Sequence, residues 1–285
     1  MKKFLIMLIL AVIFQAGVYL YMDRVLLLPA ADFSQQTVSE GDQQAVDPTK
    51  ISTDQKYLAN LEPTAVVFVT ADNKTVKELT LGTGEVVTYF AWVPDSHLAL
   101  IGISTTEASA QTTTVTLKPI NLDTNSKPQE PKITGLALGS KIEAVAFSPQ
   151  VNVTYMLITG KNSAMIYRTD ANNSLTKVLT SSYVTRIACL QSSDTLLYDN
   201  KQDRSIYTKS IKGTVKLAVP KNDKYALIGA DKDDNIYIGK LNTAGLVTVV
   251  MKGTLKGNFV DLQTLISPAQ PAAVTVNYAG NLQVN

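Results

Sequence analysis

The sequence of 285 residues contains one cysteine, Cys189, and one histidine, His97. A single cysteine excludes an internal disulfide bond, and together the two residues are too few for the usual zinc sites. Charged residues are also scarce at 18%, and 26 Lys and Arg stand against 24 Asp and Glu. A nearly neutral chain lacks the basic surface that nucleic-acid binding needs. We therefore expect no metal site, no cofactor and no nucleic-acid partner.

One long apolar run lies at the start of the sequence, at residues 4–22. As a helix it is roughly 28 Å long, which is close to the apolar thickness of a bilayer. Two lysines precede the run, whereas the charges of Asp23 and Arg24 after it cancel. Because basic residues stay on the cytoplasmic side, residues 1–24 are predicted to form a single-pass anchor in the cell membrane. The C-terminal domain is then expected to be extracytoplasmic.

A cleaved signal peptide is the alternative interpretation of this run. It is favoured less, because the run is long for a signal peptide and no Ala-x-Ala cleavage site follows it. From Asp32 to Glu62 the composition shifts to Gln, Ser, Asp and Thr. Residues 25–62 are therefore predicted to form a flexible stalk. The folded domain is expected to comprise residues 63–285.

The predicted domain has the sequence pattern of an all-β protein. Apolar residues alternate with polar ones or form short β-branched runs, and no stretch of 12 or more residues keeps helical spacing. Tyr167, Tyr207 and Tyr237 each lie on the strand after a polar hairpin, at intervals of 40 and 30 residues. Four strands in about 40 residues are typical of a β-propeller blade, which must stack on its neighbours to cover both faces.

Two segments resemble the repeat of TolB-type and related WD40-like bacterial β-propellers. They are Phe90–Ala99 and Ala146–Gln150, and they are similar to the Trp/Phe-Ser-Pro-Asp-Gly turn that joins the first two strands of a blade in those proteins. A third segment, Ala230–Gly239, resembles the polar hairpin and aromatic strand of NHL-type propellers. The resemblance implies a propeller fold. Trp92 and Phe147 are then expected to be wedges between neighbouring blades, since large aromatic side chains fill such interfaces.

The repeat intervals predict about five blades, give or take one. We expect residues 64–83 and 258–285 to share a blade, so that strands from the two ends close the ring. Closure is favoured because an unpaired sheet edge promotes aggregation. A β-sandwich or an open β-meander is the main alternative.

Catalytic signals are few in this sequence. No Gly-x-Ser-x-Gly turn occurs, and His97 follows Pro94 and Asp95 in a tight turn, where a solvated side chain is expected rather than a general base. We therefore predict no catalytic residue and no enzymatic activity. Paired carboxylates from different blades, as glycoside hydrolysis would need, stay open as an alternative.

Three polar hairpins are the candidate binding site. They lie at residues 161–163, 199–204 and 231–234, and each is expected to join the second and third strands of a blade, so that all three emerge on one rim. The candidate binding residues are Asp199, Asp203, Arg204, Asp231, Asp233 and Asp234. The aspartates at 231–234 are no EF-hand loop, because Ile236 and Asn242 occupy its Gly and Glu positions. Such a rim is either simply solvated or a docking face.

These patterns together predict a membrane-anchored extracytoplasmic binding or scaffold protein. Its propeller would dock another envelope protein or a polar ligand, and residues 4–22 would hold it at the membrane. Two alternatives belong to other classes. One is an extracytoplasmic carbohydrate-active enzyme on a propeller. The other is a structural subunit of an envelope complex, which would require an exposed apolar patch.

Overall fold

The computed structural model describes residues 50–285, except residues 108, 110, 125–127, 222 and 285. The predicted anchor at residues 1–24 and the predicted stalk up to residue 49 lie outside the described residues. Within the described part, no helix has the length and apolar character to cross a membrane. Every described strand belongs to one compact unit, Asp47–Asn285.

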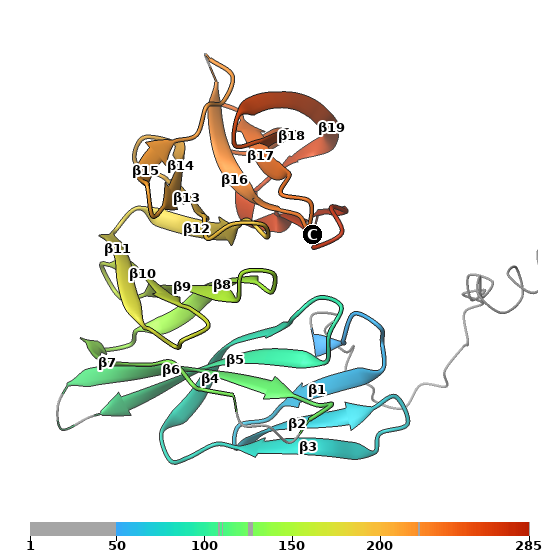
Figure 1. The fold of residues 1–285 in the computed structure, drawn as a ribbon, viewed down its shortest axis with the longest axis vertical. Coiled ribbons are helices and arrows are strands. Elements are labelled where there is room, and N and C mark those ends of the chain that lie inside the picture. The colour runs from blue at the N-terminus through green and yellow to red at the C-terminus, as the bar shows by residue number, and fades with distance from the viewer. Residues whose placement is uncertain (1–49, 108, 110, 125–127, 222, 285) are drawn as a thin grey trace, which may run out of the picture. The chain divides into compact units, whose positions relative to one another are not determined.

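The described strands form six antiparallel sheets, which we name A to F in chain order (Figure 1). Sheet A contains β1 (Tyr57–Leu61), β2 (Ala65–Thr70) and β3 (Thr75–Thr80). Sheet B contains β4 (Glu85–Trp92), β5 (Leu98–Glu107), β6 (Thr112–Asn121) and β7 (Lys132–Ala137). Sheet C contains β8 (Lys141–Ser148), β9 (Val153–Thr159), β10 (Ala164–Thr169) and β11 (Thr176–Ser181).

The C-terminal half continues in the same way. Sheet D contains β12 (Val184–Cys189), β13 (Leu196–Asn200), β14 (Ser205–Ser210) and β15 (Gly213–Lys216). Sheet E contains β16 (Lys224–Ala230), β17 (Ile236–Leu241), β18 (Val247–Thr254) and β19 (Gly257–Ala269). A short 3-10 helix, Pro271–Ala273, leads to sheet F, which has only β20 (Val274–Val276) and β21 (Leu282–Val284).

Each sheet is a meander in which every strand pairs with the next one in sequence. The short polar turns explain this order, because an antiparallel hairpin needs only a few residues to reverse the chain. The predicted all-β class is confirmed, and four consecutive four-stranded sheets have the organisation of propeller blades. Six sheets are present among the described residues, one more than the central estimate from the sequence.

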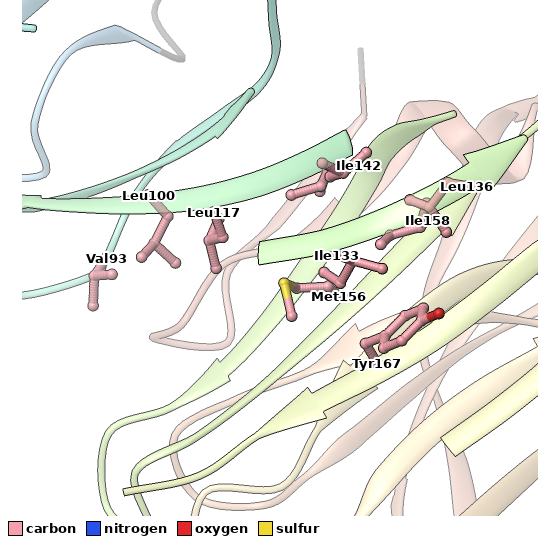
Figure 2. Packing of buried hydrophobic residues seen from close by; sticks show 10 residues of the cluster. Val93, Leu100, Leu117, Ile133, Leu136, Ile142, Met156, Ile158 and Tyr167 are labelled. Atoms are coloured by element: carbon pink, nitrogen blue, oxygen red, sulfur yellow. The ribbon is translucent and has the colours of Figure 1, made fainter. Parts of the chain in front are cut away.

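The core lies between successive sheets rather than inside any one of them. Sheet C shows this most clearly, because the side chains of β9 alternate between its two faces. Met156 and Ile158 pack toward sheet B, whereas Tyr155 and Leu157 pack toward sheet D. Figure 2 shows the cluster on the sheet B side, where Ile142 from β8 joins Met156 and Ile158. A strand covered on both faces carries a continuous apolar run, as β9 does.

The predicted closure of the ring by shared strands is wrong. Residues 258–285 do not pair with residues 64–83; instead β19 pairs with β18 in sheet E, and β20 pairs only with β21 among the described strands. The physical reason is local. Thr254 pairs with Gly257 across a two-residue turn, so β19 finds its partner immediately before it in sequence. Sheet F consequently has two strands where sheets B to E have four.

The predicted boundary at residue 63 also needs correction. β1 spans Tyr57–Leu61, which the sequence assigned to the stalk, and it pairs along its length with β2. Tyr57 and Ala59 are buried, and the indole Nε1 of Trp92 donates a 2.9 Å hydrogen bond to the carbonyl oxygen of Lys50. The folded domain therefore includes residues before Pro63. β1 is only five residues long and lies among polar residues, so its alternation of apolar and polar side chains does not stand out in the sequence.

Candidate functional site

Turns of the sheets gather on two rims. We name as the first rim the turns that join the first and second strands of sheets B to F, at residues 93–97, 149–152, 190–195, 231–235 and 277–281. The second rim holds the turns between second and third strands, including residues 160–163, 201–204 and 242–246. In an antiparallel meander these two kinds of turn lie at opposite ends of a sheet.

The expectation that the three polar hairpins share one rim is therefore wrong. Residues 161–163 and 201–204 lie on the second rim, but residues 231–234 join β16 to β17 on the first rim. The sequence analysis grouped Tyr237 with Tyr167 and Tyr207, which lie on the third strands of sheets C and D, whereas Tyr237 lies on β17, the second strand of sheet E. Asp203 and Arg204 are thus separated from Asp233 and Asp234 by the length of a strand.

Two of the six candidate residues are buried and serve the fold. The Asp199 carboxylate accepts hydrogen bonds from the backbone N–H groups of Thr185 and Arg186 at 3.1 and 2.8 Å, and from the Thr185 hydroxyl at 2.8 Å. Burial raises the pKa of Asp199. Asp231 accepts hydrogen bonds from its own turn and from the Tyr237 hydroxyl at 2.8 Å. Asp203, Arg204 and Asp233 are exposed, and Asp234 is half-buried.

Hydrogen bonds connect the first-rim turns of sheets C, D, E and F to one another. The Ser148 hydroxyl donates a 3.0 Å hydrogen bond to the carbonyl oxygen of Gln191, which links sheet C to sheet D. Asp234 accepts hydrogen bonds from the backbone N–H groups of Gln191 and Ser192, which links sheet D to sheet E. The N–H of Lys232 donates to the carbonyl oxygen of Tyr278 at 2.9 Å, which links sheet E to sheet F.

A second connection between sheets C and D is ionic. Arg168 on β10 binds Asp194 through Nε and Nη2, with the shortest contact at 2.6 Å, and its Nη1 reaches Asp170 at 3.0 Å. The Tyr155 hydroxyl donates a further hydrogen bond to Asp194. Burial and the hydrogen bond to Asp194 raise the pKa of Tyr155. Although burial raises the pKa of Asp194, hydrogen bonds from Arg168 and Tyr155 hold it below its usual value.

His97 lies between two carboxylates rather than free in solvent. Its Nδ1 is 2.7 Å from Oδ1 of Asp123, and its Nε2 is 2.8 Å from Oδ2 of Asp54. Hydrogen bonds to Asp54 and Asp123 raise the pKa of His97. The expected solvated turn residue is therefore a half-buried clamp between the segment before β1 and sheet B. No group of three or more His, Cys, Asp or Glu side chains in the described part has the geometry of a metal site.

A central cavity of about 260 Å³ lies where the first strands of sheets B to F face one another. Its walls are mainly apolar and aromatic, and among them are Tyr89, Trp92, Phe147, Ile187, Ile228 and Tyr278. The lining also includes Cys189 and Gln191, but no carboxylate and no basic side chain. Paired carboxylates of the kind that glycoside hydrolysis needs are therefore not gathered in this cavity.

Trp92 and Phe147 line this cavity and also pack against the apolar clusters between neighbouring sheets. The Trp92 ring meets Phe68 of sheet A and Phe90 of its own strand, each at a centroid distance of 5.7 Å in an edge-to-face arrangement. Phe147 packs on the cluster between sheets B and C. Edge-to-face packing at this distance is a favourable aromatic geometry.

Sequence reasoning missed Arg186, which attaches the last sheet. Its guanidinium donates hydrogen bonds to three carbonyl oxygens: those of Leu227 on β16 at 3.1 Å, Val274 on β20 at 3.2 Å, and Pro271 of the 3-10 helix. Burial lowers the pKa of Arg186. A lone arginine on a short apolar strand was the available signal, but its partners are up to 88 residues away in sequence.

No protein-family model matches the sequence, and no curated protein matches it. Solved structures are similar in fold. The dipeptidyl peptidase 4 of Porphyromonas gingivalis has a TM-score of 0.51 at 12% identity, over 81% of this chain and 40% of that one. TolB of Acinetobacter baumannii has a TM-score of 0.45 at 15% identity, over 74% of this chain and 52% of TolB. Virginiamycin B lyase of Staphylococcus aureus has a TM-score of 0.46 at 14% identity, over 77% of this chain and 68% of the lyase.

Of these three, the similarity to the dipeptidyl peptidase, with a TM-score above 0.5, supports the β-propeller fold. The chain spans less than two thirds of the length of the dipeptidyl peptidase and of TolB. The prediction that the chain is not an enzyme is corrected by the same comparison. A propeller of this kind is part of a protein named as a peptidase, so neither the fold nor the missing Gly-x-Ser-x-Gly turn is a ground for excluding an enzymatic activity.

Proposed function

We propose that the chain is a binding and scaffold protein whose first rim docks a basic segment of another protein. Residues 4–22 hold it in the membrane, and the propeller lies on the extracytoplasmic side. The observation that carries the proposal is the chain of hydrogen bonds that joins the first-rim turns of sheets C, D, E and F. A surface that is already rigid loses little conformational entropy when a partner binds.

The charges of this rim favour a basic partner. Asp194 and Asp233 of the first rim have side chains that are 42 and 64% exposed, and Asp95 of the same rim is also exposed. Lys232 is the exposed cation beside Asp233, at 3.1 Å. Exposed aspartates on a fixed frame attract and orient Lys and Arg side chains of a partner. Of the residues predicted from the sequence, this assigns binding to Asp233 and Asp234 and not to Asp203 and Arg204.

Site-specific photocrosslinking in the source cells tests the docking face. A photoreactive residue at Asp95 or Asp233, both exposed on the first rim, is expected to capture one stoichiometric partner. The same residue at Lys201 or Gln202, exposed on the second rim, is the matched control and is expected to capture none. Capture from the second rim alone, or capture from both rims with equal yield, would contradict the proposal.

Charge reversal gives a second measurement on the same face. Asp95→Asn combined with Asp233→Lys should reduce capture of the partner at least tenfold without lowering the thermal midpoint, because both side chains are exposed and Asn tolerates the positive φ of residue 95. The membrane part of the proposal is tested separately. Alkaline phosphatase fused after residue 285 is active only when exported, so an inactive fusion would place the propeller in the cytoplasm.

A structural subunit of an envelope complex is the second candidate, and β19 favours it. This strand of 13 residues is the outer strand of sheet E, and its exposed side chains include Val260, Leu262 and Ile266. Ile266 is fully exposed at 105%. Long outer strands with exposed apolar side chains are prone to pair with other chains. Leu262→Lys with Ile266→Lys should dissociate such a complex in sedimentation experiments, and unchanged sedimentation would count against this candidate.

A further inference from the structure

One of the residues that line the central cavity has an unsatisfied hydrogen-bond acceptor. Gln191 lines the cavity and is only 4% exposed. Its Nε2 donates a 3.4 Å hydrogen bond to the carbonyl oxygen of Phe147. Its Oε1 is buried and has no hydrogen-bond partner among the described residues. A buried polar atom without a partner costs about 1–3 kcal/mol, so the fold retains an unfavourable group at this position.

The backbone of Gln191 is held independently of its side chain. Its N–H donates to Asp234, and its carbonyl oxygen accepts a hydrogen bond from Ser148. Both contacts come from neighbouring sheets, so the residue is fixed from two sides. The backbone of Gln191 is therefore fixed on the first rim, while the 3.4 Å hydrogen bond to Phe147 holds its amide group. An amide oxygen on a fixed backbone beside a cavity is suited to recognise a donor on a bound molecule.

The rest of the cavity is neutral and lined with rings. None of the residues that line it carries a charged side chain. Burial raises the pKa of the Tyr89 phenol to about 12 and the pKa of the Cys189 thiol to about 12, so both groups stay protonated near neutral pH. A charged molecule would lose its hydration here without gaining an ionic partner. The walls at Trp92, Phe147 and Tyr278 offer ring faces and edges instead.

The size of the cavity limits what can occupy it. Its 260 Å³ equals the volume of roughly nine water molecules at about 30 Å³ each. A single ring system of about that many non-hydrogen atoms matches this space. The lining reaches the first rim at Pro94, Pro149 and Tyr278, and Pro149 is exposed. The cavity is therefore bounded by the same rim that we propose as a docking face.

We propose that the central cavity binds a neutral, ring-bearing small molecule that donates one hydrogen bond to Oε1 of Gln191. Molecules of the indole or phenol class have this chemistry: one aromatic ring system and one N–H or O–H donor. The donor satisfies the buried amide oxygen, while the ring replaces cavity space with contacts to Trp92, Phe147 and Tyr278. This site is distinct from the exposed aspartates of the proposed docking face, which are not among the lining residues.

Indole and 1-methylindole are the probes that test the proposal, because they differ in the N–H donor. Thermal unfolding of the full chain in detergent is followed by circular dichroism as each probe is added, and affinity is obtained from the rise in the midpoint. Wild-type protein should bind indole about fivefold to tenfold more tightly than 1-methylindole, which is the ratio expected for one hydrogen bond. Equal affinities, or no saturable rise with indole, would overturn the proposal.

Two variants assign the effect to Gln191. Gln191→Leu has a similar shape without the acceptor and should bring the ratio of the two affinities to about one. Gln150→Leu removes an exposed glutamine from the neighbouring first-rim turn, so it is the matched control and should keep the wild-type ratio. A Gln191→Leu protein that still prefers indole would refute the role of the amide oxygen.

A cavity-filling variant keeps the test decisive if Gln191→Leu does not fold. Ala91→Leu places a larger side chain in the cavity lining and should abolish the midpoint rise with both probes. Its own circular dichroism spectrum and melt report whether it is folded. If the folded Ala91→Leu protein bound both probes as the wild type does, the ligand would lie elsewhere. The first-rim variants measure capture of a protein partner, whereas the cavity variants measure binding of the two indole probes. Each proposal can therefore fail without affecting the test of the other.

Discussion

Oδ2 of Asp54 lies 2.8 Å from Nε2 of His97, and this contact joins residues that are 43 positions apart. Asp123 is 2.7 Å from the other ring nitrogen, so the imidazole is held between two carboxylates. Both nitrogens donate only when the ring is protonated. The clamp is therefore complete only with a cationic His97, and its strength depends on pH.

The first prediction concerns this pH dependence. The pKa of His97 is raised in the folded state, so its contribution to stability is complete below the unfolded pKa of about 6.5 and is lost as the pH rises through the higher folded value. The pKa of Asp54 is lowered, so its contribution is complete above about 3.8 and is lost on acidification. The contacts of His97 with Asp54 and Asp123 should therefore stabilise the folded protein most between about pH 4 and pH 6.5.

Urea unfolding of the wild type and of His97→Gln measures this effect. The wild type should be the more stable protein at pH 5.5, by less than about 1 kcal/mol because the carboxylates are exposed. At pH 9 the difference should shrink. A difference that grows with pH would mean that neutral His97 is the favoured form in the folded protein.

The second prediction concerns Gly102 at the seam between sheets B and C. A Cβ at this position would lie 2.8 Å from Cβ of Tyr89 and 3.1 Å from atoms of Ile142. Gly102→Ala should therefore cost about 1–3 kcal/mol by overpacking, measured as a lower urea midpoint. Gly82→Ala is the control, because its nearest neighbour would be Glu85 at 3.5 Å. Equal midpoints for the two variants would show that the seam can relax.

The third prediction concerns Arg186 and the C-terminal hairpin. Arg186→Met would remove the donor to the carbonyl oxygens of Leu227, Pro271 and Val274. Hydrogen bonds from a charged group contribute about 1.5–3 kcal/mol, so β20 and β21 should open much more often. Hydrogen exchange of residues 271–284 should accelerate at least tenfold, with little change in sheet C. Arg204→Met, at an exposed position, should leave exchange there unchanged.

The fourth prediction separates two aspartates that the sequence placed in one binding site. Asp199→Ala would leave the N–H groups of Thr185 and Arg186 and the hydroxyl of Thr185 without their acceptor. It should cost about 1–3 kcal/mol. Asp203→Ala should change the free energy of unfolding by less than about 0.5 kcal/mol, since Asp203 is exposed. Similar urea midpoints for both variants would show that Asp199 is not a structural residue.

The fifth prediction concerns Trp92. Trp92→Ala should destabilise the protein by about 3–5 kcal/mol, because the indole fills the seam between sheets A and B. Trp92→Phe should cost less, mainly the hydrogen bond to the Lys50 carbonyl oxygen, which is worth about 1 kcal/mol. Circular dichroism is the appropriate probe, since Trp92 is the only tryptophan of the chain. A cost below about 1 kcal/mol for Trp92→Ala would place the indole outside the core.

The sequence predicts the sheets well where strands and turns are local. The apolar runs at residues 142–147, 154–158 and 164–168 coincide with β8, β9 and β10 of sheet C, whereas the more exposed β11 has no such run. Apolar runs such as Tyr155–Ile158 are visible because both faces of β9 are covered. Hairpin pairing depends on neighbouring residues, so local patterns carry the information.

The pairing of the end sheets and the lining of the cavity depend on contacts that local sequence patterns do not contain. The segment after residue 257 could pair with the N-terminal strands or with β18, and only the short turn at Leu255 and Lys256 favours the second. Gln191 and Tyr278 come from different sheets and meet only after the sheets pack. No local pattern in sequence distinguishes a turn glutamine that faces solvent from one that lines a cavity.

The meander within each sheet has a consequence for synthesis of the protein. Since every sheet from B to E is made of consecutive residues, its strands can pair as soon as they are synthesised, and its open face is covered when the next sheet forms. Sheet F has two strands and is attached through the guanidinium of Arg186 on sheet D. Chains truncated before residue 271 would leave Arg186 without two of its three acceptors, the carbonyl oxygens of Pro271 and Val274.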